Sequence, residues 1–244
     1  MTEVPGTPTE TYYDEAWKRK LQRPEYATLD RRWRSRWDFV VNHISNGAQV
    51  LDMGCGDGIL GEQLIRLKNC HVTGLDVSDF ALSRASMHGI EVRKCDVSMS
   101  QVPFKDNNFD VVILSCVLEH IALPEQALSE ATRVVREGGY VFVTIPNPLT
   151  WRIRIAFALG KFHSDFLHSK PGEGLHYRFW TVKTGLEDMV RSLGLPLVLT
   201  TKEVDVKNPR KYSKFGLHWH RSLIRIWPAL FGEYMHYIFR EAPL

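Results

Sequence analysis

The chain has 244 residues, of which 44% are apolar and 24% charged, a composition typical of a soluble globular protein. It has no apolar run of the ~18 residues that a membrane-spanning helix needs, and its first residues lack the basic start and apolar core of a secretory signal. A net charge of +3 is too small to indicate a nucleic-acid partner by itself. We therefore expect one elaborated domain in the cytoplasm.

The four cysteines are scattered along the chain, and no two of them form a Cys-x-x-Cys pair: Cys55, Cys70, Cys95 and Cys116. This spacing favours reduced, buried thiols over a metal site, and we expect no metal.

Two helices are predicted before the first strand. Residues Thr11 to Gln22 form a polar amphipathic pattern that contains Tyr12, Tyr13 and Trp17. A second helix is expected from about Tyr26 to Ile44, because apolar residues recur there at three- and four-residue spacing.

Strands and helices alternate from Gln49 onward. The expected strands are 49–53, 71–76, 90–94, 109–115 and 139–145, and the expected helices are 58–68, 79–88 and 124–136. The continuous apolar run Val111 to Leu114 is typical of a parallel strand that is covered on both faces. The alternation predicts an α/β fold with a doubly wound sheet.

Residues 146–180 interrupt this alternation, because three prolines and three glycines fall within them. We interpret the segment as an irregular insertion with a helix around Trp151 to Leu159. Thr181 is then predicted to cap a helix that continues through Leu193 and ends at Gly194.

Two more strands are expected near the C-terminus, at Pro196 to Val206 and Tyr234 to Arg240. The segment between them, residues 207–231, is basic and also carries apolar residues: Lys207, Arg210, Lys211, Lys214, Arg221, Arg225, Leu223, Ile226, Trp227, Leu230 and Phe231. Two interpretations remain open for it, a solvated face or a surface that receives an anionic acceptor or a membrane headgroup, although Pro228 interrupts any helix.

The stretch from Val50 to Gly58, Val-Leu-Asp-Met-Gly-Cys-Gly-Asp-Gly, says most about function. Glycines at alternate positions let the backbone turn tightly and lie against a ligand. Such a turn after a parallel strand is where doubly wound sheets bind nucleotide-like ligands. The NAD fingerprint needs a third small residue where Ile59 stands, so a dinucleotide is disfavoured.

These residues resemble motif I of the class I S-adenosylmethionine-dependent methyltransferases, and more specifically the type 11, UbiE-like group. Four further segments of that family's pattern follow in order: Gly74 to Ser78, Cys95 to Val97, Phe109 to His120 and Arg136 to Ile145. The resemblance implies a Rossmann-like sheet that is mostly parallel and ends in an antiparallel strand pair, with S-adenosylmethionine as cofactor.

The resemblance also implies which residues contact the cofactor. They lie in the first helix and at the ends of the first four strands: Tyr13, Asp52, Gly54, Gly56, Asp76, Val77, Asp96, Val97, Ser115 and Leu118. Asp76 would accept the ribose hydroxyls and Asp96 the adenine amino group. From the residues alone, a helix cap remains open for Asp76 and a surface turn for Asp96. We expect Asp52 to support the glycine loop, because a buried carboxyl group must find hydrogen bonds.

Candidate catalytic residues follow from the chemistry of methyl transfer. Alignment can supply most of the acceleration, and a base is needed only when the acceptor is a hydroxyl or a protonated amine. A neutral imidazole, with its ordinary pKa of ~6.5, is suited to that task. His120, at the end of the fourth strand, is the first candidate, with lining of the cofactor pocket as the alternative. His176 and Tyr177 in the insertion are further candidates.

Ile145 to Arg154 also resembles MetW-type proteins and methyltransferases of surface-polysaccharide pathways. Leu-Glu-His at 118–120 departs from the MetW type and favours a working enzyme. We expect O-methylation of a small-molecule or glycan-like metabolite. The alternatives are N-methylation of a small amine and a non-catalytic S-adenosylmethionine-binding or partner subunit.

A nucleic-acid substrate is disfavoured because no Asp/Asn-Pro-Pro-aromatic motif follows the fourth strand, whereas peripheral membrane contact through the basic segment stays open. The expected organisation is one methyltransferase domain. It comprises an N-terminal helical lid (1–46), a cofactor-binding core (47–145) and two acceptor-side insertions (146–180 and 207–231), with the oligomeric state left open.

Overall fold

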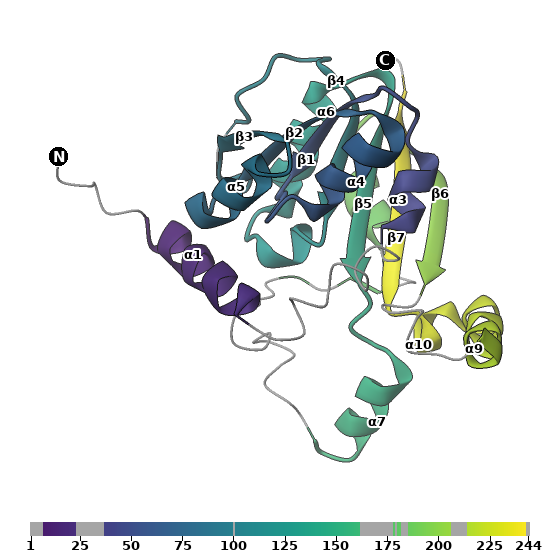
Figure 1. Cartoon of the computed structure of the whole chain (residues 1–244). Helices are drawn as coiled ribbons and strands as arrows, with labels where there is room; N and C mark the ends of the chain where they lie inside the picture. The colour runs from purple at the N-terminus through teal and green to yellow at the C-terminus, as the bar shows by residue number, and fades with distance from the viewer. Residues whose placement is uncertain are drawn as a thin grey trace.

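The computed structural model describes residues 7–22, 37–99, 101–161, 178, 180–181, 185–205 and 214–242. Its strands are β1 Gln49–Met53, β2 His71–Asp76, β3 Glu91–Lys94, β4 Phe109–Ser115, β5 Val135–Pro146, β6 Leu197–Asp205 and β7 Tyr234–Glu241 (Figure 1). Its α-helices are α1 Pro8–Leu21, α3 Asp38–His43, α4 Ile59–Lys68, α5 Asp79–Ser86, α6 Pro124–Val134, α7 Trp151–Ala158, α8 Leu186–Ser192, α9 Lys214–Ile226 and α10 Pro228–Phe231. A 3₁₀ turn covers Leu118–His120.

The strands form one seven-stranded sheet in the order β3-β2-β1-β4-β5-β7-β6. Strands β1 to β5 pair in parallel, whereas β7 runs antiparallel to both β5 and β6. The predicted doubly wound sheet with an antiparallel C-terminal pair is therefore confirmed. The strand order reverses between β1 and β4, which is where such sheets bind ligands.

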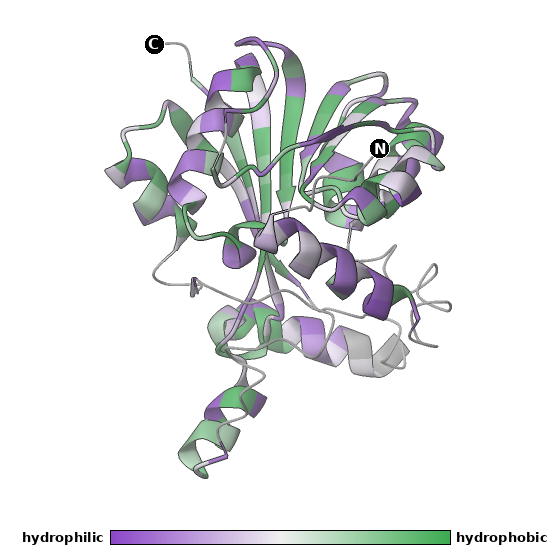
Figure 2. Ribbon diagram, turned by 90° about the vertical axis from the view of Figure 1, so that its left-hand side faces the viewer, coloured by the Kyte–Doolittle hydropathy of each residue, from purple (hydrophilic) through white to green (hydrophobic). Residues whose placement is uncertain are grey.

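Side chains that alternate along the strands build a separate core on each face of the sheet. Leu51 and Leu114 point to one face and pack with α6 and α8. Val50 and Ile113, one residue away on the same two strands, point to the other face and pack with α3, α4 and α5. Figure 2 shows the hydrophobic strands enclosed between these helical layers. Because helices cover both faces of the sheet, a ligand site can form only where the strands end, at their carboxyl termini.

Helix α1 begins earlier than its apolar pattern indicates. Thr7 caps it in a capping box, in which the Thr7 hydroxyl accepts from the Glu10 N–H and the Glu10 carboxylate accepts from the Thr7 N–H. Of the second predicted helix, 26–44, the structure shows Asp38–His43, and residues 23–36 lie outside the described part of the chain.

The ends of two further predicted helices also differ from the structure. The helix predicted to start at Thr181 starts at Leu186, and its N-cap is Gly185, which has no side chain to cap the helix. The helix predicted to end at residue 136 ends at Val134, because Val135 pairs with Phe109 and so begins β5. The ladder then shifts register before Tyr140 pairs with Val111, so the glycine turn at 138–139 lies inside the strand as an irregularity.

Gly58 shows why the glycine motif is needed for folding as well as for a ligand. It joins β1 to α4 with φ +80°, and a Cβ atom built there would lie 2.7 Å from the Ala85 Cα of α5. The backbone of α5 thus occupies the space that a side chain at position 58 would need.

We expect Gly58→Ala to lower the free energy of unfolding by about 2–4 kcal/mol, through left-handed backbone strain and overlap with Ala85. Gly47→Ala is the matched control, since Gly47 has φ +74° but no atom within 4 Å of its Cβ position. It should cost about 1 kcal/mol through the backbone alone. Urea unfolding measures both, and equal losses would contradict the steric argument.

Candidate active site

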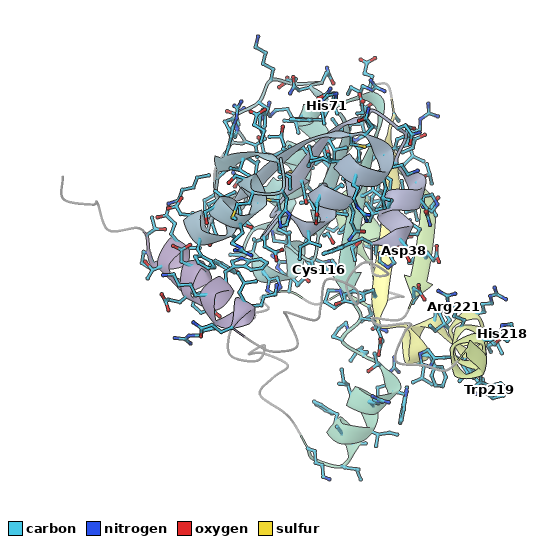
Figure 3. The ribbon with its side chains drawn as sticks, in the orientation of Figure 1. Asp38, His71, Cys116, His218, Trp219 and Arg221 are labelled. Carbon is cyan, nitrogen blue, oxygen red and sulfur yellow. The ribbon has the colours of Figure 1, made fainter. Side chains whose placement is uncertain are left out.

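A cavity of about 470 Å³ lies at the carboxyl ends of β1, β2 and β4, within the size range of cofactor sites. In Figure 3, His71 at the start of β2 and Cys116 after β4 lie at opposite ends of the sheet, with Cys116 at the cavity end. One face of α1 and the residues Pro146 and Tyr234 complete the lining. The cavity therefore lies at the reversal of strand order.

The glycine loop after β1 forms one wall of the cavity. The Gly54 and Cys55 N–H groups donate to the Leu75 carbonyl at 2.7 and 2.8 Å, which ties the loop to the end of β2. A Cβ atom on Gly54 would lie 2.4 Å from the Val117 Cγ2, and one on Gly56 would lie 2.4 Å from the Trp17 ring. The two glycines let Val117 and Trp17 pack directly on the loop.

Asp76 ends β2 and joins the glycine loop to the following helix. Its carboxylate accepts from the Gly56 N–H at 2.9 Å through Oδ2 and from the Ser78 N–H at 3.0 Å through Oδ1. The helix cap is Ser78, whose hydroxyl accepts from the Ala81 N–H at 3.0 Å, so the cap role considered for Asp76 belongs to its neighbour. Burial raises the pKa of Asp76, and these two backbone donors oppose that rise. The carboxylate also lines the cavity, beside Val77.

Asp52 is buried at the end of β1 and lines the same cavity. Burial, reinforced by the negative charge of Asp76, raises the pKa of Asp52 to about 7. Among the described residues, no hydrogen-bond donor reaches its carboxyl group, which differs from the supporting role expected for it. A carboxyl group in this position can gain a partner from a cation that enters the cavity.

Asp96 and Val97 follow β3 and line the same cavity. The Asp96 carboxylate accepts from the Ser98 N–H at 3.0 Å and from the Ser98 hydroxyl at 2.7 Å, which forms a local turn. That turn holds the half-buried carboxylate at the edge of the cavity.

The fourth strand delivers Ser115, Cys116, Glu119 and His120 to the cavity. His120 Nε2 lies 3.9 Å from Glu119 Oε1, and the Glu119 side chain is almost fully buried. The His120 carbonyl accepts from the Tyr13 hydroxyl at 3.1 Å, so α1 contacts this turn directly. The Ser115 hydroxyl accepts from the Trp37 indole N–H at 3.3 Å.

Leu118 differs from the other predicted cofactor residues. Its side chain is fully buried in the core shared with α6 and does not line the cavity, because the 3₁₀ turn directs it toward the helix layer. The other nine predicted cofactor residues, from Tyr13 to Ser115, do line it. His176 and Tyr177 lie outside the described residues.

Helix α1 covers the cavity. Of its residues, Tyr13 was assigned to the site from the sequence, but Trp17 was not. Asp14 Oδ1 accepts from the Ser78 hydroxyl at 2.5 Å and from the Phe80 N–H at 3.1 Å, which fixes α1 to the start of α5. Tyr13 and Trp17 share one helical face and line the cavity, whereas Tyr12 is exposed. That four-residue spacing could have identified Trp17 as a site residue.

Cys116 is a second residue that sequence patterns did not assign to the site. Its backbone has φ +57°, a region that residues other than glycine seldom adopt. Its N–H donates to the Thr144 carbonyl of β5 at 2.7 Å, which holds the turn that places Val117 on the glycine loop. Strained backbone of this kind is frequent at functional sites.

Comparisons with known proteins agree with this geometry. Residues 51–143 match the family described as Methyltransferase domain. The chain is 31% identical over 169 residues to the ubiquinone biosynthesis O-methyltransferase of Chromobacterium violaceum, a match that covers 66% of this chain and 71% of that relative. The chain belongs to the class I S-adenosylmethionine-dependent methyltransferases.

Solved structures of this family share the fold. A methyltransferase in complex with the Haloferax volcanii Trm112 methyltransferase activator matches with a TM-score of 0.66 at 14% identity, covering 96% of this chain and 98% of that one. A Thermotoga maritima S-adenosylmethionine-dependent methyltransferase matches with a TM-score of 0.64 at 18% identity, covering 93% and 98%. As a member of this family, the present chain has S-adenosylmethionine as its cofactor. The size and the acidic lining of its cavity fit a cationic nucleoside of that kind.

Proposed function

We propose that this methyltransferase transfers the methyl group to a hydroxyl of a small-molecule or glycan-like acceptor. The observation that carries the proposal is the position of His120, a potential base that lines the cavity at the end of β4 beside a buried glutamate. The names of the curated relatives, which are O-methyltransferases of ubiquinone biosynthesis, support transfer to oxygen.

The cofactor contacts are assigned from the cavity lining. Asp76 would accept the ribose hydroxyls while it keeps its bonds to Gly56 and Ser78, and Asp96 would accept the adenine amino group. Gly54 lets the backbone lie against the ligand, and Asp52 would accept from the cationic amino group. When bound, S-adenosylmethionine supplies an electrophilic methyl group on a positively charged sulfur.

The remaining chemistry falls to the residues of the β4 turn. His120 Nε2 would take the proton of the acceptor hydroxyl as the oxygen attacks. The Glu119 carboxylate, 3.9 Å away, would stabilise the imidazolium that forms. Tyr13 of α1 contacts this turn, Trp17 packs on the glycine loop, and together they would exclude water from the reacting groups.

The raised pKa of Asp52 predicts a pH-dependent cofactor affinity. A carboxyl group with a pKa of about 7 is largely protonated at pH 6, and binding a cationic amino group requires its ionised form. S-adenosylhomocysteine should therefore bind about eight-fold more tightly at pH 7.5 than at pH 6, with proton release on binding. Calorimetry in buffers of different ionisation enthalpy measures both quantities.

Asp52→Asn is the matched variant for this prediction. It should bind S-adenosylhomocysteine more weakly, with an affinity that no longer changes with pH.

The stability of the ligand-free protein should change with pH in the opposite direction to the cofactor affinity. Because the folded protein binds this proton more tightly than the unfolded chain, stability should fall as the pH rises from about 4 to about 7. An unchanged pH profile in Asp52→Asn would contradict the assignment.

The proposed activity is tested with methyl-labelled S-adenosylmethionine and a cell extract. Label is counted in the lipid, small-metabolite and macromolecular fractions, and mass spectrometry of the product assigns the methyl group to oxygen or nitrogen. Label on an oxygen of a lipid-soluble or small metabolite is expected. Label confined to nitrogen, to nucleic acid, or to no fraction despite tight cofactor binding would overturn the proposal.

A further inference from the structure

Helix α7 and its C-cap Leu159 carry exposed apolar side chains next to the cavity end of the sheet. No residue of this helix is buried, and Ile155 is 51% exposed, with Trp151 and Leu159 exposed as well. Figures 1 and 2 show α7 projecting beyond the sheet, with hydrophobic residues along it. A helix this short gains little stability on its own, so its order is expected to depend on a surface that packs against it.

A second exposed apolar group lies on α9 and at its junction with α10. Trp219, Ile226 and Trp227 are 62%, 64% and 55% exposed, whereas Ile224 on the opposite side of α9 is buried. In Figure 3, the Trp219 and His218 side chains point from α9 away from the sheet. The helix therefore packs through one side and presents large apolar groups on another.

Hydrogen bonds connect the segment that carries α7 to the segment that carries α10, beside the cavity. The Arg154 guanidinium of α7 donates to the Ala229 carbonyl of α10 at 3.3 Å. The Asn147 amide donates to the carbonyls of Ala229 and Gly232, at 3.3 and 2.8 Å. Pro146 and Tyr234, the neighbouring residues in β5 and β7, pair with each other and line the cavity. Both exposed groups thus lie beside the part of the cavity that Pro146 and Tyr234 line.

The charged side chains of helices α7, α9 and α10 all have the same sign. Helices α7, α9 and α10 contain no Asp or Glu, and their basic residues are Arg152, Arg154, Lys214, Arg221 and Arg225. Of these, Arg221 lies 3.6 Å from Asp205 of β6. We define the basic aromatic surface by Trp151, Ile155, Leu159, Trp219, Ile226 and Trp227 together with Arg152 and Arg225, all of which are exposed.

We propose that the basic aromatic surface binds the headgroup region of an anionic lipid bilayer and holds the mouth of the cavity against it. Tryptophan favours the membrane–water interface, and arginine is attracted to anionic headgroups. No helix among the described residues is long and apolar enough to cross a bilayer, so the contact is peripheral. The proposal does not depend on which acceptor is methylated.

Vesicle sedimentation tests the proposal with the full chain. Vesicles of phosphatidylcholine alone are compared with an equimolar mixture of phosphatidylcholine and phosphatidylglycerol. The wild-type protein should bind the mixed vesicles, and its binding should weaken as salt is added. The triple variant Trp219→Ser, Ile226→Ser, Trp227→Ser and the charge reversal Arg225→Glu should each lose at least about ten-fold in vesicle affinity.

Matched controls carry the same chemical changes elsewhere on the surface. Leu67→Ser with Met87→Ser removes exposed apolar side chains, and Arg66→Glu reverses an exposed charge, all on α4 and beyond α5. These controls should bind vesicles like the wild type, and every variant should keep its affinity for S-adenosylhomocysteine, which separates this test from that of the proposed function. Two results would overturn the proposal: no binding to mixed vesicles, or self-association in solution that the triple variant abolishes.

Discussion

Replacing Asp76 with alanine should weaken S-adenosylhomocysteine binding by about 100-fold, the largest effect on cofactor affinity that we expect from one side chain. The loss would combine the two charge-assisted hydrogen bonds proposed to the ribose with release of the glycine loop, since the Asp76 carboxylate also accepts from the Gly56 and Ser78 N–H groups. Isothermal titration calorimetry measures the affinity.

Asp79→Ala is the matched control for Asp76→Ala. Asp79 lies three residues further along the chain, is exposed and pairs with Lys94 outside the cavity lining, so its loss should leave cofactor affinity unchanged. Asp76→Asn should weaken binding less than Asp76→Ala does, because the amide loses the charge but its one oxygen can still accept from either the Gly56 or the Ser78 N–H group. Wild-type affinity in Asp76→Ala would show that the ribose assignment is wrong.

Replacing His120 with alanine should lower kcat by about 10²–10⁴-fold while the affinity for S-adenosylhomocysteine changes little. The reason is that we assign Asp76 and Asp96 to the cofactor and His120, which lines the cavity from the β4 turn, to the acceptor. Single-turnover kinetics with the acceptor identified from the extract measures the chemical step.

Added imidazole should restore part of the activity of His120→Ala, which a purely structural role would not allow. His88→Ala is the control, because His88 pairs with Glu62 away from the cavity. A kcat in His120→Ala close to that of the wild type would support the pocket-lining alternative and an acceptor that needs no base.

Local sequence patterns were sufficient to predict much of the lining of the cavity. The apolar strand that ends in Asp52, followed by glycines at alternate positions, predicted a ligand loop, and the structure places Gly54 and Gly56 there with left-handed backbones. The acid that ends β2 was predicted from the same alternation of strands and helices. These features depend on a few adjacent residues, so a single sequence contains them.

Contacts between distant residues were decided by the tertiary structure. The sequence could not show that Trp17 packs on Gly56 and that Asp14 binds Ser78, because about 40 to 65 residues separate the partners. Nor could it show that Leu118 turns into the core while Glu119 and His120 face the cavity, since a 3₁₀ turn sets those directions. The link from Arg154 to Ala229, which brings the basic aromatic surface to the cavity mouth, likewise exists only after the sheet pairs β5 with β7. The strand periodicity and glycine spacing are properties of neighbouring residues and can be recognised along the chain. The cavity lining from α1, Pro146 and Tyr234, in contrast, comes together only when the chain has folded.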